Sequence, residues 1–152
     1  MPHIHEKIDF TSEVFIVHKD KVLLRMHDKF KIWLSVGGHI ELDEDPEEAA
    51  IREVKEEVGL DIELVGRKPD LNDPENYAVM APQYMVRHFV NATHEHVTFV
   101  YFARSQTDKV MDAISGHELA ETKWVDKEGL EKMDLKNNIR FFAMKALEEL
   151  GK

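Results

Sequence analysis

The sequence predicts a single α/β domain in which helices cover a mixed sheet. Candidate strands stand on both sides of one strongly charged candidate helix, and all of these elements fit within 152 residues. A chain of this length buries roughly 68–70% of the surface that it exposes when unfolded, so it can hold a core without disulfides or a structural metal. The chain has no cysteine, repeat or linker. We therefore expect one domain over residues 1–152.

Apolar and β-branched runs, separated by polar turns, place the elements in order along the chain. Two strands, 10–17 and 22–26, flank a polar turn and form an opening hairpin. A helix begins near Pro46 with Asp45 as its N-cap and ends at Gly59, because these residue types favour helix starts and ends. The later expected elements are a strand at 62–65, a surface loop at 66–77, a hairpin of 84–90 and 97–104, a strand at 121–125, and helices at about 127–133 and 138–150.

The chain is acidic, with 30 Asp and Glu against 20 Lys and Arg and a formal charge of −10. This balance argues against binding of a long nucleic-acid backbone, which relies on clustered basic side chains. Residues 41–60 hold nine acids against Arg52 and Lys55, so this window carries −7 of the total. The start of the chain lacks the layout of a signal peptide, and no apolar run approaches the roughly 18–20 residues of a membrane span. We expect a cytoplasmic protein without a membrane partner.

Part of this acidity falls on one face of the expected helix, because positions three and four apart lie together. The converging acids are Glu53, Glu56 and Glu57, and the apolar stripe on another side is Ile51, Val54 and Val58. Converging carboxylates raise each other's pKa values unless a cation lies among them. Mg²⁺ and Mn²⁺ prefer oxygen ligands, so a divalent metal site is the functional interpretation. A purely structural, solvated acidic helix is the alternative.

The same segment carries a longer motif. From Gly38 the chain reads Gly38, five residues, Glu44, seven residues, Arg52-Glu53-Val54, one residue, Glu56-Glu57, one residue, Gly59-Leu60. This pattern is similar at all nine constrained positions to the Nudix box of the Nudix hydrolases, and a chance match is on the order of 10⁻⁷. The resemblance covers about residues 10–150.

The resemblance implies an α/β/α sandwich with a mixed central sheet. It also implies hydrolysis of diphosphate linkages in small nucleoside diphosphate-linked compounds, with water as the nucleophile and Mg²⁺ or Mn²⁺ as the cofactor. The implied metal ligands are the carbonyl of Gly38 (or Gly37), Glu53, Glu56, Glu57 and, from outside the box, Glu118, which we prefer to Glu121 or Glu95. A Nudix fold that senses nucleotides or ADP-ribose without hydrolysis is the alternative.

Catalytic roles follow from the same resemblance. Glu53 is the expected general base with Glu118 second, Glu57 belongs to the catalytic set, and Arg52 orients the carboxylates with Glu44 in reach. Three further residues are candidates for substrate binding, namely Arg25, His39 and Tyr77, the last lying 17 residues after Leu60.

Two histidine pairs, His3/His5 and His94/His96, have a strand-like spacing that places two imidazoles on one face. A solvated terminus and a hairpin tip explain them, and we assign them no metal. The sequence leaves the oligomeric state open, a homodimer included.

Overall fold

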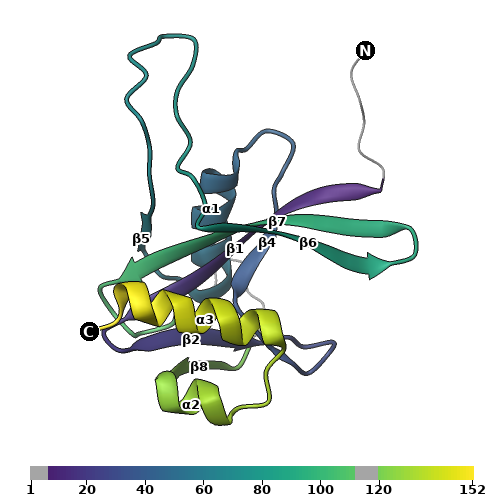
Figure 1. The fold of residues 1–152 in the computed structure, drawn as a ribbon, viewed down its shortest axis with the longest axis vertical. Coiled ribbons are helices and arrows are strands. Elements are labelled where there is room, and N and C mark those ends of the chain that lie inside the picture. Colours follow the sequence, from purple (N-terminus) through teal and green to yellow (C-terminus); the bar gives the residue numbers. More distant parts are fainter. Residues whose placement is uncertain (1–6, 112–119) are drawn as a thin grey trace.

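The computed structural model describes residues 7–111 and 120–152, which form eight strands and three helices (Figure 1). The strands are β1 (Ile8–His18), β2 (Lys21–Met26), β3 (Trp33–Leu34), β4 (Val36–His39), β5 (Ile62–Val65), β6 (Tyr84–Asn91), β7 (His94–Ser105) and β8 (Thr122–Val125). The helices are α1 (Pro46–Val58), α2 (Lys127–Lys132) and α3 (Asn137–Leu150). No helix in these described ranges is long and apolar enough to cross a membrane.

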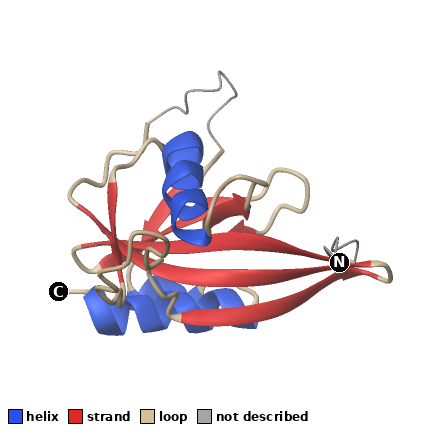
Figure 2. Ribbon diagram, turned by 90° about the horizontal axis from the view of Figure 1, so that it is seen from above, coloured by secondary structure: helices blue, strands red, loops and turns tan. Residues whose placement is uncertain are grey.

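All eight strands belong to one mixed sheet, which confirms the expected fold class. The central path is β3-β2-β1-β7-β5, with β4 added to β1, β6 to β7 and β8 to β2. The long pair β1 and β7 is parallel, whereas every other pair is antiparallel. Figure 2 shows α1 on one side of this sheet and the other two helices on the opposite side, so the domain has three layers.

Alternation along β1 divides the core between the two faces of the sheet. Phe15 and Val17 pack with α2 and α3, while Val14 and Ile16 pack with α1, and all four are almost fully buried. This division matters for the site, because side chains at odd-numbered positions of β1 face α3. The end of the hairpin formed by β6 and β7 extends past α3, so that face is open there (Figure 1).

Helix α1 has the boundaries that the sequence predicts. Asp45 accepts a hydrogen bond from the Glu48 amide in a capping box, and Gly59 ends the helix in the left-handed region with φ of 67°. The buried stripe differs from the expected one, since Ala50, Val54 and Val58 pack on the sheet and Ile51 is 47% exposed. Ala50, Val54 and Val58 are spaced four residues apart and form the row that faces the sheet, and Ile51 lies at the edge of that row.

Two further differences concern strands. Residues 36–39 form β4, which the sequence does not predict. Its two glycines give the segment little strand propensity, and it is a strand because it pairs with β1. The second hairpin has a tighter turn than expected, so His94 and His96 lie within β7 instead of the hairpin tip. The loop after β5 runs from residue 66 to residue 83 and contains the expected 66–77 segment.

Candidate functional site

The carboxylates of α1 meet the backbone of β4, and the two glycines of this strand allow the close approach. A Cβ atom at Gly38 would lie 2.4 Å from Glu53 Oε1, and one at Gly37 would lie 2.2 Å from the Ser12 carbonyl oxygen. The Ser12 hydroxyl donates to the Pro46 carbonyl over 2.8 Å, which ties β1 to the start of the helix. A side chain at Gly37 would therefore clash with the backbone of β1, whereas one at Gly38 would require the Glu53 carboxylate to move.

Arg52 organises the loop and the helix around one guanidinium group. Its Nε lies 2.9 Å and its Nη2 2.6 Å from the two oxygens of Glu44, and Nη2 also donates to the His39 carbonyl over 3.0 Å. Its Nη1 donates to Glu53 over 3.0 Å and to Glu56 over 3.1 Å. Hydrogen bonding by Arg52 lowers the pKa of Glu44, so this paired contact holds a carboxylate ion.

Glu57 contacts a different arginine. Its Oε2 lies 2.8 Å from Arg25 Nη1, and its side chain is 17% exposed. Burial raises the pKa of Glu57 despite the attraction of Arg25, and the neighbouring Glu53 raises it further. Among the described residues, the buried Nε of Arg25 has no hydrogen-bond partner.

This donor set fits a hard divalent cation. The side chains of Glu53 and Glu57 lie close together, and Glu53 contributes to the raised pKa of Glu57. A cation between them would remove the repulsion between the two carboxylates. The available donors are carboxylate and carbonyl oxygens, as Mg²⁺ and Mn²⁺ prefer, and Glu56 adds a carboxylate that is 49% exposed at the outer rim.

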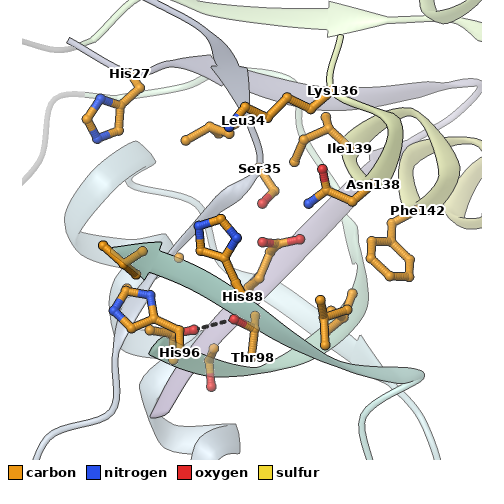
Figure 3. Close-up of a pocket in the computed structure, with 18 of the residues that line it drawn as sticks. His27, Leu34, Ser35, His88, His96, Thr98, Lys136, Asn138, Ile139 and Phe142 are labelled. Atoms are coloured by element: carbon orange, nitrogen blue, oxygen red, sulfur yellow. Dashed lines mark hydrogen bonds between the residues drawn. The ribbon is translucent and has the colours of Figure 1, made fainter. Parts of the chain in front are cut away.

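A cavity of about 560 Å³ opens on the other side of β4, between the sheet and the start of α3 (Figure 3). This volume is typical of small-molecule sites. Gly37, Gly38 and His39 line it, so the strand that touches the α1 carboxylates also forms one wall of the cavity. Its other lining residues include Glu13, Ser35, His88, Lys136, Asn138 and Phe142.

Glu13 is the titratable group that the sequence gives no reason to select. It lies on β1 opposite Gly37, on the face that carries the cavity. Burial raises the pKa of Glu13 to about 7, while a hydrogen bond with Ser35 opposes the shift. At neutral pH a fraction of this carboxyl is therefore protonated and can donate a hydrogen bond to a ligand. A lone charged residue within the otherwise uncharged run 10–17 is the only sequence signal for it.

The structure brings some of the predicted site residues together and leaves others apart. Glu53, Glu56, Glu57, Arg52 and Arg25 form one cluster in contact with β4. His39 is adjacent in sequence, but its side chain lines the cavity on the opposite face and lies 3.1 Å from Asp9.

Three other candidates lie elsewhere. Tyr77 is 79% exposed in the loop between β5 and β6 and does not line the cavity. Glu118 lies outside the described residues. Of the two less favoured acids, Glu95 is 4% exposed and is bound to Arg87 over 2.6 Å, whereas Glu121 is exposed just before β8.

Comparison with known proteins gives one family. The family model described as NUDIX domain matches residues 11–145. A crystal structure of a NUDIX-family hydrolase from Clostridium perfringens is 37% identical, covers 97% of this chain and 99% of its own, and superimposes with a TM-score of 0.83.

Two curated relatives have named activities. The nucleoside triphosphatase NudI of Enterobacter sp. (strain 638) is 28% identical over 116 residues, which cover 76% of this chain and 77% of that protein. The dihydroneopterin triphosphate diphosphatase of Haemophilus influenzae is 38% identical over 74 residues, which cover 48% of this chain and 46% of that protein.

Proposed function

This chain belongs to the NUDIX domain family, and we propose that it is a metal-dependent pyrophosphohydrolase of small nucleotides. The observation that carries the proposal is the cluster of Glu53 and Glu57 against the backbone of Gly38, one strand away from a nucleotide-sized cavity. The names of the relatives support it, since one is a nucleoside triphosphatase and another a diphosphatase acting on a triphosphate.

We assign the metal to the oxygen donors around β4. Glu53, Glu56, Glu57 and the Gly38 carbonyl would hold Mg²⁺ or Mn²⁺, and Glu118 remains our candidate for a further ligand. When bound, a divalent ion there supplies a Lewis acid that neutralises charge on the diphosphate.

The chain's own side chains account for the remaining chemistry. Glu53 accepts the proton of the attacking water, because its carboxylate lies against Gly38 of β4 and Arg52 fixes its orientation over 3.0 Å. Arg52 itself is held by Glu44, so the guanidinium cannot turn away from the site. Arg25, whose side chain is 26% exposed, lies beside Glu57 and offers its guanidinium to a phosphate oxygen.

We propose that the cavity receives the nucleoside part of the substrate. A base entering it would meet the carboxyl of Glu13, the amide of Asn138 and the ring of Phe142, a combination of hydrogen-bonding groups and an apolar surface. The diphosphate would then extend past β4 toward the α1 carboxylates. This geometry suits a small nucleotide and requires no long nucleic-acid strand.

The test measures phosphate or pyrophosphate release from nucleoside triphosphates, ADP-sugars and dinucleotides with Mg²⁺ or Mn²⁺. We expect Glu53→Gln and Glu57→Gln each to lose on the order of 10²-fold or more in kcat, which is the typical contribution of a positioned base or charged group. Glu63→Gln, at an exposed position of β5, is the matched control and should retain turnover.

Equal turnover in the wild type and both site variants would refute the assignment. Tight nucleotide binding by the wild type without any product, in either metal, would instead indicate the ligand-sensing alternative.

A further inference from the structure

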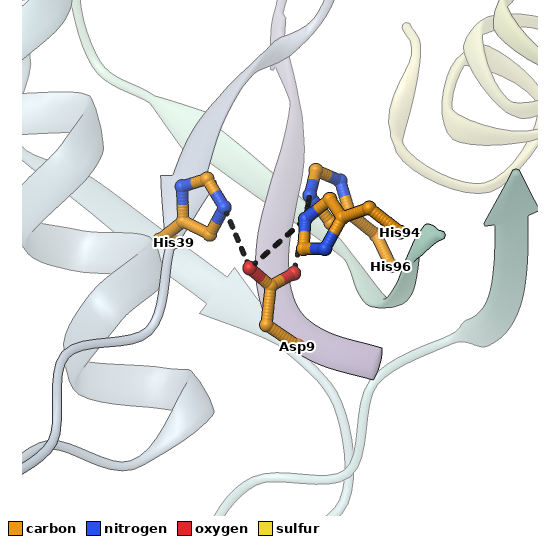
Figure 4. Close-up of side chains that lie close together, drawn as sticks. All are labelled: Asp9, His39, His94 and His96. Carbon is orange, nitrogen blue, oxygen red and sulfur yellow. Dashed lines mark hydrogen bonds and ion pairs between the residues drawn. The ribbon is translucent and has the colours of Figure 1, made fainter. Parts of the chain in front are cut away.

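A second group of metal-ligating side chains lies on the opposite face of the sheet from α1. It consists of Asp9 on β1, His39 on β4, and His94 and His96 on β7 (Figure 4). The strand register brings them together, because Asp9 pairs with His96 and Thr11, two residues further along β1, pairs with His39. We call this group the three-histidine cluster.

Three of the distances between the ligand atoms of the cluster are close to the edges of a tetrahedral site. Asp9 Oδ2 lies 3.1 Å from His39 Nε2 and 3.3 Å from His94 Nε2, and the Nε2 atoms of His94 and His96 are 3.1 Å apart. All four ligand atoms lie within 4.8 Å of one another. In a tetrahedron with bonds of 2.0–2.1 Å, as zinc forms with histidine nitrogen and carboxylate oxygen, the edges are about 3.3–3.4 Å. Small adjustments of the rings would therefore place each atom at bonding distance from one central ion.

The polar groups of the cluster do not satisfy one another in the absence of an ion. The buried Oδ1 of Asp9 accepts no hydrogen bond of good geometry from the residues that the structure describes, although His96 Nε2 lies 3.1 Å away. His94 Nε2 points toward both His96 Nε2 and Asp9 Oδ2, and one ring nitrogen carries at most one proton. A buried carboxylate oxygen surrounded by three imidazoles is explained by a cation between them.

We propose that Asp9, His39, His94 and His96 bind one transition-metal ion of the Zn²⁺ class. Three imidazole nitrogens and one carboxylate favour Zn²⁺ over Mg²⁺, which prefers an all-oxygen set. Four protein ligands close the coordination shell, as in structural zinc sites. The ion cross-links β1, β4 and β7 at the end of the sheet that α3 leaves open.

The zinc site is separate from the oxygen site of the Nudix box but adjoins it. His39 follows Gly38 directly, its side chain joins the three-histidine cluster, and its carbonyl accepts a hydrogen bond from Arg52. An ion on the His39 ring would therefore fix one end of β4 next to the carboxylates. His3 and His5 lie outside the described residues and have no part in the proposal.

The test is calorimetric titration of the full-length, metal-free chain with ZnCl₂. The titrated proteins carry Glu53→Gln and Glu57→Gln, so that the oxygen site does not compete. We expect one Zn²⁺ per chain in this background. Adding His94→Asn or Asp9→Asn to this background removes a direct ligand of the ion. Each should therefore weaken Zn²⁺ binding by more than the roughly 10–100-fold that is typical when a residue hydrogen bonded to a ligand is lost. Zn²⁺ should also raise the melting temperature of the background protein but not that of the His94→Asn protein.

His88→Asn is the matched control, since the His88 ring lies on the same face, 6.3 Å from the His96 ring, outside the cluster. It should retain full affinity. Melting of each metal-free variant verifies that it is folded. The proposal is overturned if the background protein binds no Zn²⁺, or if His94→Asn and Asp9→Asn bind it as the background does. Hydrolysis by the wild type with Mg²⁺ is measured separately, so failure of the zinc site leaves the proposed function standing.

Discussion

Glu13 couples the stability of the fold to pH, and its replacement by glutamine isolates the effect. The carboxyl lies at the cavity wall, where burial raises its pKa from 4.5 to about 7. A raised pKa means that the folded state holds the proton at pH values where the unfolded state has released it. The free energy of unfolding therefore falls as the pH rises from 4.5 to 7 and is constant with respect to this group on either side of that window.

The size of the effect follows from the shift. A rise of the pKa from 4.5 to about 7 amounts to about 3 kcal/mol, because each pKa unit corresponds to 1.36 kcal/mol. Glu13→Gln keeps the size of the side chain and removes the charge. We expect the variant to resemble the wild type near pH 4.5 and to be more stable by up to about 3 kcal/mol at pH 8.

The assay is urea unfolding of both proteins at several pH values between 4.5 and 8, with a chelator present so that no metal contributes. Other titrating groups, including Glu57, cancel in the difference between the two proteins. Glu63→Gln on β5 controls for loss of an exposed charge and should show no such pH-dependent difference. A difference between Glu13→Gln and the wild type that is the same at every pH would contradict the assigned environment of Glu13.

Two further substitutions test the junction of α1 and β4. Gly38→Ala places a methyl group 2.4 Å from Glu53 Oε1 and should therefore displace that carboxylate. We expect kcat to fall on the order of 10²-fold. A variant with the kcat of the wild type would refute the close contact. Asp45→Ala removes the 2.8 Å hydrogen bond to the Glu48 amide and should lower the free energy of unfolding by about 1 kcal/mol. Urea titrations at pH 7 measure this change. An unchanged unfolding midpoint would show that the cap contributes nothing to stability.

The parts of the fold that the sequence predicts are those fixed by local chemistry. The boundaries of α1 follow from Asp45, Pro46 and Gly59, because each of these residue types acts within one turn of the helix end. The contact of Arg52 with Glu44 follows from the motif. Strand β4 has no such local signal, since its order comes from hydrogen bonds to β1, which lies more than 20 residues away.

The Nudix-box carboxylates and the three-histidine cluster also differ in how far the sequence predicts them. The carboxylates of the Nudix box lie on one helix, so their spacing along the chain determines their spacing in space. The three-histidine cluster joins Asp9, His39 and His94 from three strands, and their proximity depends on the parallel register of β1 with β7. The sequence shows only the His94/His96 pair, which is why a hairpin tip is the simpler interpretation before the structure is known.

The structure also changes how the charge of −10 is understood. Seven of the nine acids in residues 41–60 have a specific partner: Asp45 and Glu48 in the helix cap, Glu47 on Lys68, Glu44, Glu53 and Glu56 on Arg52, and Glu57 on Arg25. The acids that converge on the helix face are thus already paired with two arginines. Under the proposed function, a divalent ion would have to compete with Arg52 Nη1 for Glu53 and Glu56, while the contact of Arg52 Nε with Glu44 would not be involved. Arg52 would therefore stay bound to Glu44 in either case, which would keep the loop and the helix together.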